Sequence, residues 1–346
     1  MASIRLLLVG VGNVGRRFLE LIERKRQRIR ELVGADLRLV GVADSGGVAL
    51  HPGGLDPIWL VRLKSEGRSV ATLPRWGRSD LDALEMVRRA EADLLLDASP
   101  ANMEDGQPGL ACIETALSRG MHVVTANKAP LVLAFSRLEE LAAEQGVALR
   151  YDATVAGGLP AINLGRHDLA AAEIYRLEGI LNLTTNYILT RMADDGLTYA
   201  QALREAQAAG HAEADPSLDV EGWDAANKLV ILAHSVLGRQ VTLDDVAVEG
   251  ILGVTPEMLA QAAAQGQRIK LLAVAEREGE AYTLSVRPTP LAADHPLAQL
   301  RPKQMGIVYH TDIGGSITAS IVEETPLPTA SAMLRDLVDI YRGPAF

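Results

Sequence analysis

Cysteine is almost absent from this chain of 346 residues. Cys112 is the only one, so an internal disulfide is excluded, and no Cys/His spacing resembles a zinc site. A chain without disulfides is typical of the reducing cytoplasm, and we expect a cytoplasmic protein.

Basic residues are fewer than acidic ones. The chain carries 34 Lys and Arg against 44 Asp and Glu, which gives a formal net charge of -10. Nucleic-acid binding relies on basic side chains that neutralise backbone phosphates. This balance therefore predicts no nucleic-acid partner.

Long apolar runs are missing as well. No stretch approaches the ~18 apolar residues of a membrane helix, and the run Ile4–Val9 meets Gly10 too early for a secretion signal. We expect a protein that is neither exported nor bound to a membrane. Its 346 residues exceed the roughly 250–300 at which one core stops growing, which predicts two domains.

Residues 1–151 alternate short apolar runs with helical patterns. Apolar strands joined by helical crossovers are typical of an α/β, doubly wound parallel sheet of the Rossmann type. The strand candidates are Ile4–Val9, Leu37–Ala43, Asp93–Ala98, His122–Thr125 and Val147–Tyr151. Helical patterns cover Val14–Ile22, Leu81–Val87 and Leu131–Leu141. Between them, Gly46–Leu73 has no regular pattern and is interpreted as a long surface excursion.

The pattern changes at residue 152, after which Gly157, Gly158 and Pro160 interrupt the chain. Residues 152–315 are predicted to form an α+β domain with its own sheet. Its strand candidates are Glu173–Leu181, Lys270–Ala275, Tyr282–Val286 and Ile307–Thr311, and its helix candidates are Thr198–Ala208 and Pro216–Leu237. Residues 316–346 form a C-terminal segment with an amphipathic helix from Pro328 through Ile340.

A glycine-rich turn directly follows the first predicted strand and opens the first helix. It reads Gly10, Val11, Gly12, Asn13, Val14 and Gly15. In this context the glycines permit a tight turn, a close backbone approach to a pyrophosphate and close helix packing, while N–H groups at the helix start bind the anion. An ordinary glycine turn is the alternative. The strand and helix around the turn favour a dinucleotide site.

Asp44 ends the second predicted strand, where an acidic residue can bind a ribose 2′-OH and repel a 2′-phosphate. This position favours NAD. The spacing from Gly10 is long because the basic run Arg24–Arg30 extends the first helix, and Arg62 and Lys64 offer compensating positive charge. The choice between NAD and NADP therefore stays open.

Four ionisable residues lie close together later in the chain: Glu213, Asp219, Asp224 and Lys228. Asp215 and Pro216 predict a helix start, with Asp215 as the N-cap and Pro216 as the first helical residue. Asp224 and Lys228 are four residues apart and so share a helix face. The alternative is a solvated surface pair.

This stretch resembles the signature of the homoserine dehydrogenase family, and the resemblance extends over nearly the whole chain. Further matching segments are Val123–Lys128, Asp152–Val155, Gly157–Pro160, Asn186–Leu189 and Pro328–Ala332. The resemblance implies NAD- or NADP-dependent interconversion of L-homoserine and L-aspartate 4-semialdehyde in threonine, methionine and isoleucine biosynthesis. Rival hypotheses are a dinucleotide sensor without catalysis and a related oxidoreductase acting on another amino acid or a sugar.

The resemblance also implies roles for individual residues. Lys228 is the proton-transfer group, and Asp224 holds either Lys228 or the substrate hydroxyl in place. Glu213 and Asp219 bind the substrate's α-ammonium group. Lys128 is a second proton-handling group or a carboxylate anchor. Ser99 follows the predicted strand Asp93–Ala98, and its place at the carboxyl edge of the sheet predicts that it approaches the nicotinamide. Thr184 and Gly158 contact the substrate, and Gly210 contacts the cofactor. Asp224 favours a charged Lys228, which suits proton donation to the aldehyde better than removal of a proton from the alcohol, unless burial offsets the pairing.

The family's monovalent-cation site, for Na or K, falls on Asp152 and on the carbonyls of Val155, Gly157 and Leu159. The family usually has Glu at the first of these positions, and the shorter Asp152 puts direct coordination in doubt. Leu183 replaces a glycine of the substrate loop, and Glu323–Ala330 lacks the family's Gly-Ala-Gly turn. The resemblance further implies a homodimer built on the second domain's sheet, and we expect no C-terminal regulatory domain and no threonine feedback.

Overall fold

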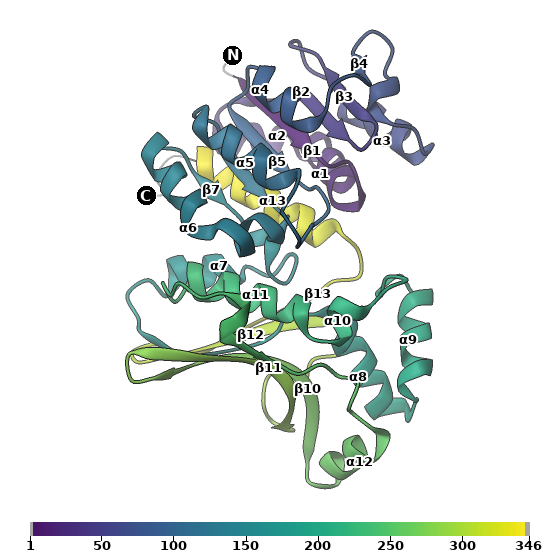
Figure 1. Cartoon of the computed structure of the whole chain (residues 1–346), viewed down its shortest axis with the longest axis vertical. Helices are drawn as coiled ribbons and strands as arrows, with labels where there is room; N and C mark the ends of the chain where they lie inside the picture. The colour runs from purple at the N-terminus through teal and green to yellow at the C-terminus, as the bar shows by residue number, and fades with distance from the viewer. Residues whose placement is uncertain (1–2, 343–346) are drawn as a thin grey trace. The chain divides into compact units, whose positions relative to one another are not determined.

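The computed structural model describes residues 3–342, which divide into two compact units. Unit 1 runs from the N-terminal strand to Gly158 and resumes at Thr325, whereas unit 2 is the continuous segment Leu159–Glu324. Each unit contains one sheet with helices packed against it (Figure 1). Unit 2 is thus inserted in the chain between the two segments that form unit 1.

Seven strands form the sheet of unit 1: β1 (Ser3–Val9), β2 (Asp36–Asp44), β3 (Gly47–Leu50), β4 (Gly77–Arg78), β5 (Leu94–Asp97), β6 (His122–Thr125) and β7 (Leu149–Arg150). Their order is β4-β3-β2-β1-β5-β6-β7. The five strands from β2 to β7 in this order are parallel, which confirms the predicted doubly wound sheet. An antiparallel edge of β3 and β4 lies beyond β2.

Helices join these strands: α1 (Asn13–Arg24), α2 (Arg26–Val33), α3 (Pro57–Ser65), η1 (Val70–Thr72), α4 (Ala83–Arg89), α5 (Gly109–Ser118) and α6 (Lys128–Gln145). The prediction that the basic run Arg24–Arg30 extends the first helix is wrong. Lys25 has φ -107° and ψ 9°, so its backbone leaves the helical region and α2 begins as a separate helix. No described helix combines the length and apolar character needed to cross a membrane.

The excursion Gly46–Leu73 is ordered and contains β3, α3 and η1. Asp56 caps α3 by accepting hydrogen bonds from Ile58 N and Trp59 N, and Pro57 occupies the first helical turn. An Asp-Pro pair is a readable helix start. The expectation of an irregular excursion missed this helix because the surrounding glycines dominate the local pattern.

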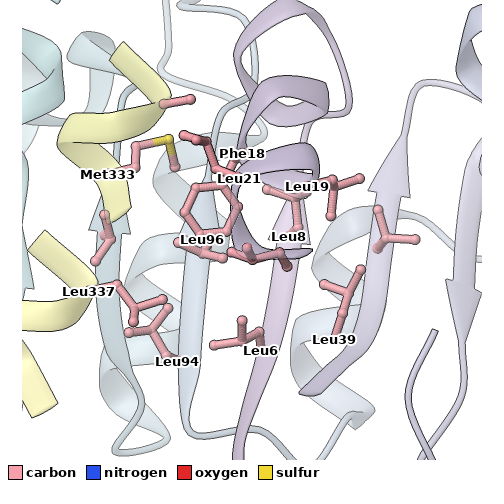
Figure 2. Packing of buried hydrophobic residues seen from close by; sticks show 14 of the residues in the cluster. Leu6, Leu8, Phe18, Leu19, Leu21, Leu39, Leu94, Leu96, Met333 and Leu337 are labelled. Carbon is pink, nitrogen blue, oxygen red and sulfur yellow. The ribbon is translucent and has the colours of Figure 1, made fainter. Parts of the chain in front are cut away.

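The core of unit 1 combines residues from both ends of the chain. Leu6 and Leu96 of the sheet and Phe18 of α1 are fully buried, as are Met333 and Leu337 of the last helix, α13 (Leu327–Tyr341). Figure 2 shows these side chains meeting in one cluster, and Figure 1 shows α13, in yellow, among the elements of unit 1. Burying such a side chain contributes about 1.5–3 kcal/mol, so α13 is an integral part of this core.

Six strands form the sheet of unit 2: β8 (Ile174–Ile180), β9 (Val246–Val248), β10 (Gln267–Glu278), β11 (Ala281–Ala292), β12 (Gln304–Thr311) and β13 (Gly315–Val322). Their order is β13-β12-β8-β10-β11-β9, and β8 pairs antiparallel with both β10 and β12. The four predicted strands are confirmed. The edge strands β9 and β13 were missed because one has three residues and the other alternates polar with half-buried positions.

Unit 2 also contains α7 (Ala161–Asn163), η3 (Leu164–Asp168), α8 (Leu183–Asp195), α9 (Tyr199–Ala208), α10 (Ser217–Val220), α11 (Trp223–Ser235), η4 (Leu243–Asp245) and α12 (Pro256–Ala264). The prediction of one helix over Pro216–Leu237 is wrong. Gly222 has φ +91°, a left-handed conformation that separates α10 from α11. The predicted cap is shifted by one residue, because Pro216 occupies the N-cap position and Asp215 Oδ1 accepts from Ser217 N at 3.1 Å.

Candidate active site

The glycine-rich turn after β1 has open space at only one of its glycines. Gly10 has φ +91°, and a Cβ there would meet Ala98 O at 2.3 Å. A Cβ on Gly15 would meet Gly10 O at 2.1 Å, whereas one on Gly12 would meet nothing within 4 Å. Packing thus requires Gly10 and Gly15, and the backbone at Gly12 is accessible to a pyrophosphate.

The start of α1 suits an anion. Within the described chain, no side chain caps its first turn, and the turn contains no acidic residue. Arg16 lies over the turn, with Nη2 donating to Asn13 Oδ1 at 2.9 Å and Nε donating to Gly12 O at 3.3 Å. The helix N-terminus and this guanidinium both favour negative charge, so these residues fit the pyrophosphate of NAD or NADP.

Asp44, predicted to bind the adenosine ribose, is committed to internal contacts. Its carboxylate accepts from Lys64 Nζ at 2.6 Å, Ser69 Oγ at 2.6 Å, Val70 N at 2.9 Å and Gly46 N at 2.9 Å. Burial raises the pKa of Asp44, but these four bonds outweigh it and hold the pKa below its ordinary value. Asp44 therefore anchors the excursion to β2 and has its acceptor positions filled.

A buried polar network lies at the ends of β5 and β6. Ser99 Oγ donates to Asp97 Oδ1 at 2.6 Å and accepts from Asn127 Nδ2 at 3.1 Å, and Thr125 Oγ1 donates to Asp97 Oδ2 at 3.1 Å. Burial raises the pKa of Asp97, although these hydrogen bonds oppose the shift. The network fixes the Ser99 hydroxyl beside the glycine-rich turn, because Gly10 packs directly on Ser99 N. Of the four residues in this network, only Ser99 is a predicted site residue.

Lys128 begins α6 three residues after the end of β6, and Asn127 caps that helix by accepting from Ala129 N at 3.1 Å. Ala98 N donates to Val9 O at 2.8 Å, so the ends of β1 and β5 are adjacent. Lys128 is half-buried at this same end of the sheet. Unit 1 thus brings the start of α6 to the edge that carries the glycine-rich turn, where doubly wound sheets bind ligands.

The loop after β7 does not hold its acidic side chain as a cation ligand. Asp152 is 1% exposed and ion-paired with Arg335 of α13, and its N–H donates to Asp336 Oδ2 at 3.0 Å. The guanidinium supplies the positive charge that Na or K would bring, so coordination by the Asp152 side chain does not fit. Among residues 3–342, no group of three or more His, Cys, Asp or Glu is placed to hold a metal. Cation binding by the Val155, Gly157 and Leu159 carbonyls stays a prediction.

In unit 2, Lys228 and Asp224 lie one turn apart on α11, as their spacing predicts. Lys228 Nζ donates to Asp224 Oδ2 at 2.6 Å and to the Leu181 carbonyl at 2.7 Å. The two side chains are only 14% and 8% exposed, so they are not a solvated surface pair. A largely buried amine with two of its three N–H groups held by the protein can present the third to a reacting oxygen.

A second carboxylate joins this pair through an amide. Asn182 Nδ2 donates to Asp219 Oδ1 at 2.6 Å and to Asp224 Oδ2 at 2.8 Å. Burial raises the pKa of Asp219, the neighbouring Asp224 raises it further, and Thr184, Asn182 and Lys228 oppose the shift without cancelling it. Asn182 is not among the predicted site residues. The sequence can predict that Asn182 caps α8, but it cannot predict that the side chain contacts α10 and α11.

Glu213, the other predicted ammonium ligand, makes no hydrogen bond or ion pair with this cluster in the described part of the chain. It is exposed. Thr184 is buried, and its Oγ1 donates to the His211 carbonyl at 2.7 Å, which ties the start of α8 to the 209–215 loop. Gly210, in that loop, has φ +73° and open space at its Cβ position. Gly158 is buried.

A turn that fits a dinucleotide in unit 1 and a buried lysine held by a carboxylate and a backbone carbonyl in unit 2 define an NAD(P)-dependent oxidoreductase. The family models agree: "Homoserine dehydrogenase, NAD binding domain" matches residues 10–152 and "Homoserine dehydrogenase" matches residues 160–338. The chain belongs to the homoserine dehydrogenase family, whose members act on the CH–OH group of homoserine.

Individual relatives support this over the full chain. A homoserine dehydrogenase of Methanocaldococcus jannaschii is 36% identical over 98% of both chains. An NAD(+)-dependent homoserine dehydrogenase of Pseudomonas canavaninivorans is 36% identical over 99% of this chain and 97% of its own. The crystal structure of a homoserine dehydrogenase from Thiobacillus denitrificans superposes with a TM-score of 0.86 at 31% identity, covering 99% of this chain and 74% of that one.

Proposed function

We propose that this chain interconverts L-homoserine and L-aspartate 4-semialdehyde, with Lys228 as the proton-transfer group. The observation that carries the proposal is the buried Lys228 amine held by Asp224 and the Leu181 carbonyl. NAD or NADP, when bound at the glycine-rich turn, accepts or supplies the hydride. The remaining chemistry belongs to the protein's own side chains.

In the direction of reduction, Lys228 donates a proton to the carbonyl oxygen as that oxygen becomes a hydroxyl. In the direction of oxidation, it receives the hydroxyl proton. Asp224 orients Lys228, and Asp219 binds the substrate's α-ammonium group, for which a largely buried carboxylate is a suitable partner. Lys128 anchors the substrate carboxylate or handles a second proton, and Ser99 approaches the nicotinamide. Glu213, whose side chain is exposed, is the second proposed ligand of the ammonium group.

Absorbance of NAD(P)H with L-homoserine as substrate tests this function directly. We expect turnover in the native chain and a loss of about 10²- to 10⁴-fold in Lys228→Ala, the usual effect of removing a proton-transfer group. The matched control is Lys25→Ala, which removes an exposed lysine. Near-native turnover in Lys228→Ala would remove this residue from the mechanism. Cofactor binding without turnover would indicate a sensor, and turnover of another alcohol alone would indicate a related oxidoreductase.

We also propose a homodimer that forms through the sheet of unit 2 and acts in a reducing compartment. Exposed apolar side chains on this sheet support the first point: Tyr175 of β8, Ile313 of the β12–β13 turn and Val322 of β13 are 47%, 71% and 54% exposed. The single buried thiol, Cys112, supports the second.

A further inference from the structure

Asn182 stands between β8 and α8 and uses every polar atom of its side chain. Its Oδ1 accepts from Thr185 N at 2.8 Å and from Thr185 Oγ1 at 2.9 Å. Its Nδ2 donates to Asp219 and Asp224. A flipped amide would point its N–H groups at two donors and its oxygen at two carboxylates, so the surroundings allow one orientation only.

The two carboxylates that Asn182 joins carry like charge and come from different helices. Asp219 belongs to α10, and Asp224 belongs to α11. Contacts run from Asp219 through Asn182 to Asp224 and on to Lys228, and the charged groups acting on Asp219 are Asp224 and Lys228. The carbonyl of the preceding residue, Leu181, accepts the second N–H of Lys228. One dipeptide therefore contacts all three charged groups of the cluster.

We propose that Asn182 is a positioning residue for proton transfer, whose amide keeps Asp219 and Asp224 ionised side by side and so keeps Asp224 available to hold Lys228. The proposal rests on the proposed function, which gives Lys228 its role. Two neighbouring carboxylates without a donor between them tend to share a proton, because double ionisation is unfavourable at close range in a partly buried site. A proton on this pair would remove the negative charge that orients Lys228.

The expected signature of this role is a changed pH profile. When Asn182 loses its amide, the carboxylate pair takes up a proton at higher pH than in the native enzyme. The acid limb of kcat/KM for homoserine should then move up by about one pH unit, and kcat/KM at neutral pH should fall about tenfold. A residue that only caps α8 would lower the melting temperature and leave this profile in place.

The test uses two variants and one control. Asn182→Asp keeps the size and the capping ability of the side chain and loses both amide N–H donors, whereas Asn182→Ala loses the donors and the cap together. Thr198→Ala removes the capping box of α9 in the same unit without touching the carboxylates. We expect the acid limb to shift in both Asn182 variants, more in Asn182→Asp because it adds a third carboxylate, and to stay in place in Thr198→Ala.

A native profile in the Asn182 variants, with only a lower melting temperature, overturns the proposal. Should Asn182→Asp fail to fold, as circular dichroism would show, Asn182→Ala alone decides. Failure of the proposed function gives a different result, because the native chain would then not turn over homoserine. An active native enzyme and an impaired Lys228→Ala, together with unshifted Asn182 variants, reject the positioning role alone.

Discussion

Asp44 and Lys64 neutralise each other at the end of β2, where a doubly wound fold receives the adenosine ribose. Their side chains are 6% and 20% exposed. Because internal donors already bind the carboxylate, we expect it to influence the choice of cofactor through its charge. Discrimination between NAD and NADP then depends on the net charge of this pair, which is close to zero.

We expect Lys64→Met to lower kcat/KM for NADP about tenfold and to leave kcat/KM for NAD nearly unchanged. The variant leaves Asp44 uncompensated, so its negative charge repels a 2′-phosphate, while Ser69 and two backbone N–H groups still satisfy the carboxylate. Initial rates with each cofactor measure the ratio. Lys64→Arg keeps the charge and should keep the native ratio; an equal loss with both cofactors would contradict the prediction.

Lys270 of β10 is a lysine buried to 2% exposure without a carboxylate partner in the described chain. Its Nζ donates to Asn186 Oδ1 at 2.8 Å, Thr190 Oγ1 at 2.8 Å and Leu300 O at 2.9 Å. Burial lowers the pKa of Lys270 from 10.5 to about 8. The contacts join α8 to the segment before β12, so this lysine supports the helix that begins next to Asn182.

This pKa predicts a stability that increases with pH. Between about pH 8 and 10.5 the unfolded chain binds a proton at Lys270 that the folded chain does not, so the free energy of unfolding rises across this window. The penalty of the buried charge is fully present below pH 8 and is relieved by up to roughly 3 kcal/mol toward pH 10.5. Urea unfolding should show this rise in the native chain and a flatter dependence in Lys270→Met. Equal slopes would refute it.

At the scale of elements, two glycines of the turn between β1 and α1 have different roles: Gly12 leaves room for the cofactor, and Gly15 is required for packing. Gly12→Ala places a methyl group in open space, so we expect a change in the free energy of unfolding within about 0.5 kcal/mol but at least about tenfold weaker NAD binding. Gly15→Ala drives its methyl group into Gly10 O and should destabilise unit 1 outright. Calorimetric titration with NAD and urea unfolding distinguish the two variants. Unchanged affinity in Gly12→Ala would place the pyrophosphate elsewhere.

The division of α10 from α11 is the element-scale feature that assembles the acid–lysine cluster. A continuous helix would place Asp219 five residues before Asp224 on one rigid cylinder, away from a common partner. The left-handed Gly222 turns the chain instead, and both carboxylates then reach the Asn182 amide. From the sequence alone, Gly222 does not show that the helix ends here, because the break depends on what α10 and α11 each pack against.

For the whole molecule, we expect light scattering to give twice the chain mass of 37.0 kDa. Ile313→Asp puts a charge on the most exposed apolar residue of the unit 2 sheet region and should weaken the dimer about tenfold or more, because an unpaired charge is costly in an apolar interface. Leu252→Asp, at a 59% exposed position outside the strands, is the matched control and should remain dimeric. A native chain that runs as a monomer at micromolar concentration would contradict the homodimer.

The sequence by itself determined the local structure: the parallel strands, the glycine-rich turn, the shared face of Asp224 and Lys228 and the final amphipathic helix. These depend on residue spacing and backbone stereochemistry, which neighbours along the chain set. Only the tertiary structure decided which side chains meet. Asp152 pairs with Arg335, 183 residues away, and Asn182 reaches Asp219 and Asp224 across 37 and 42 residues. Such partners are selected by the packing of whole elements, which no local pattern records.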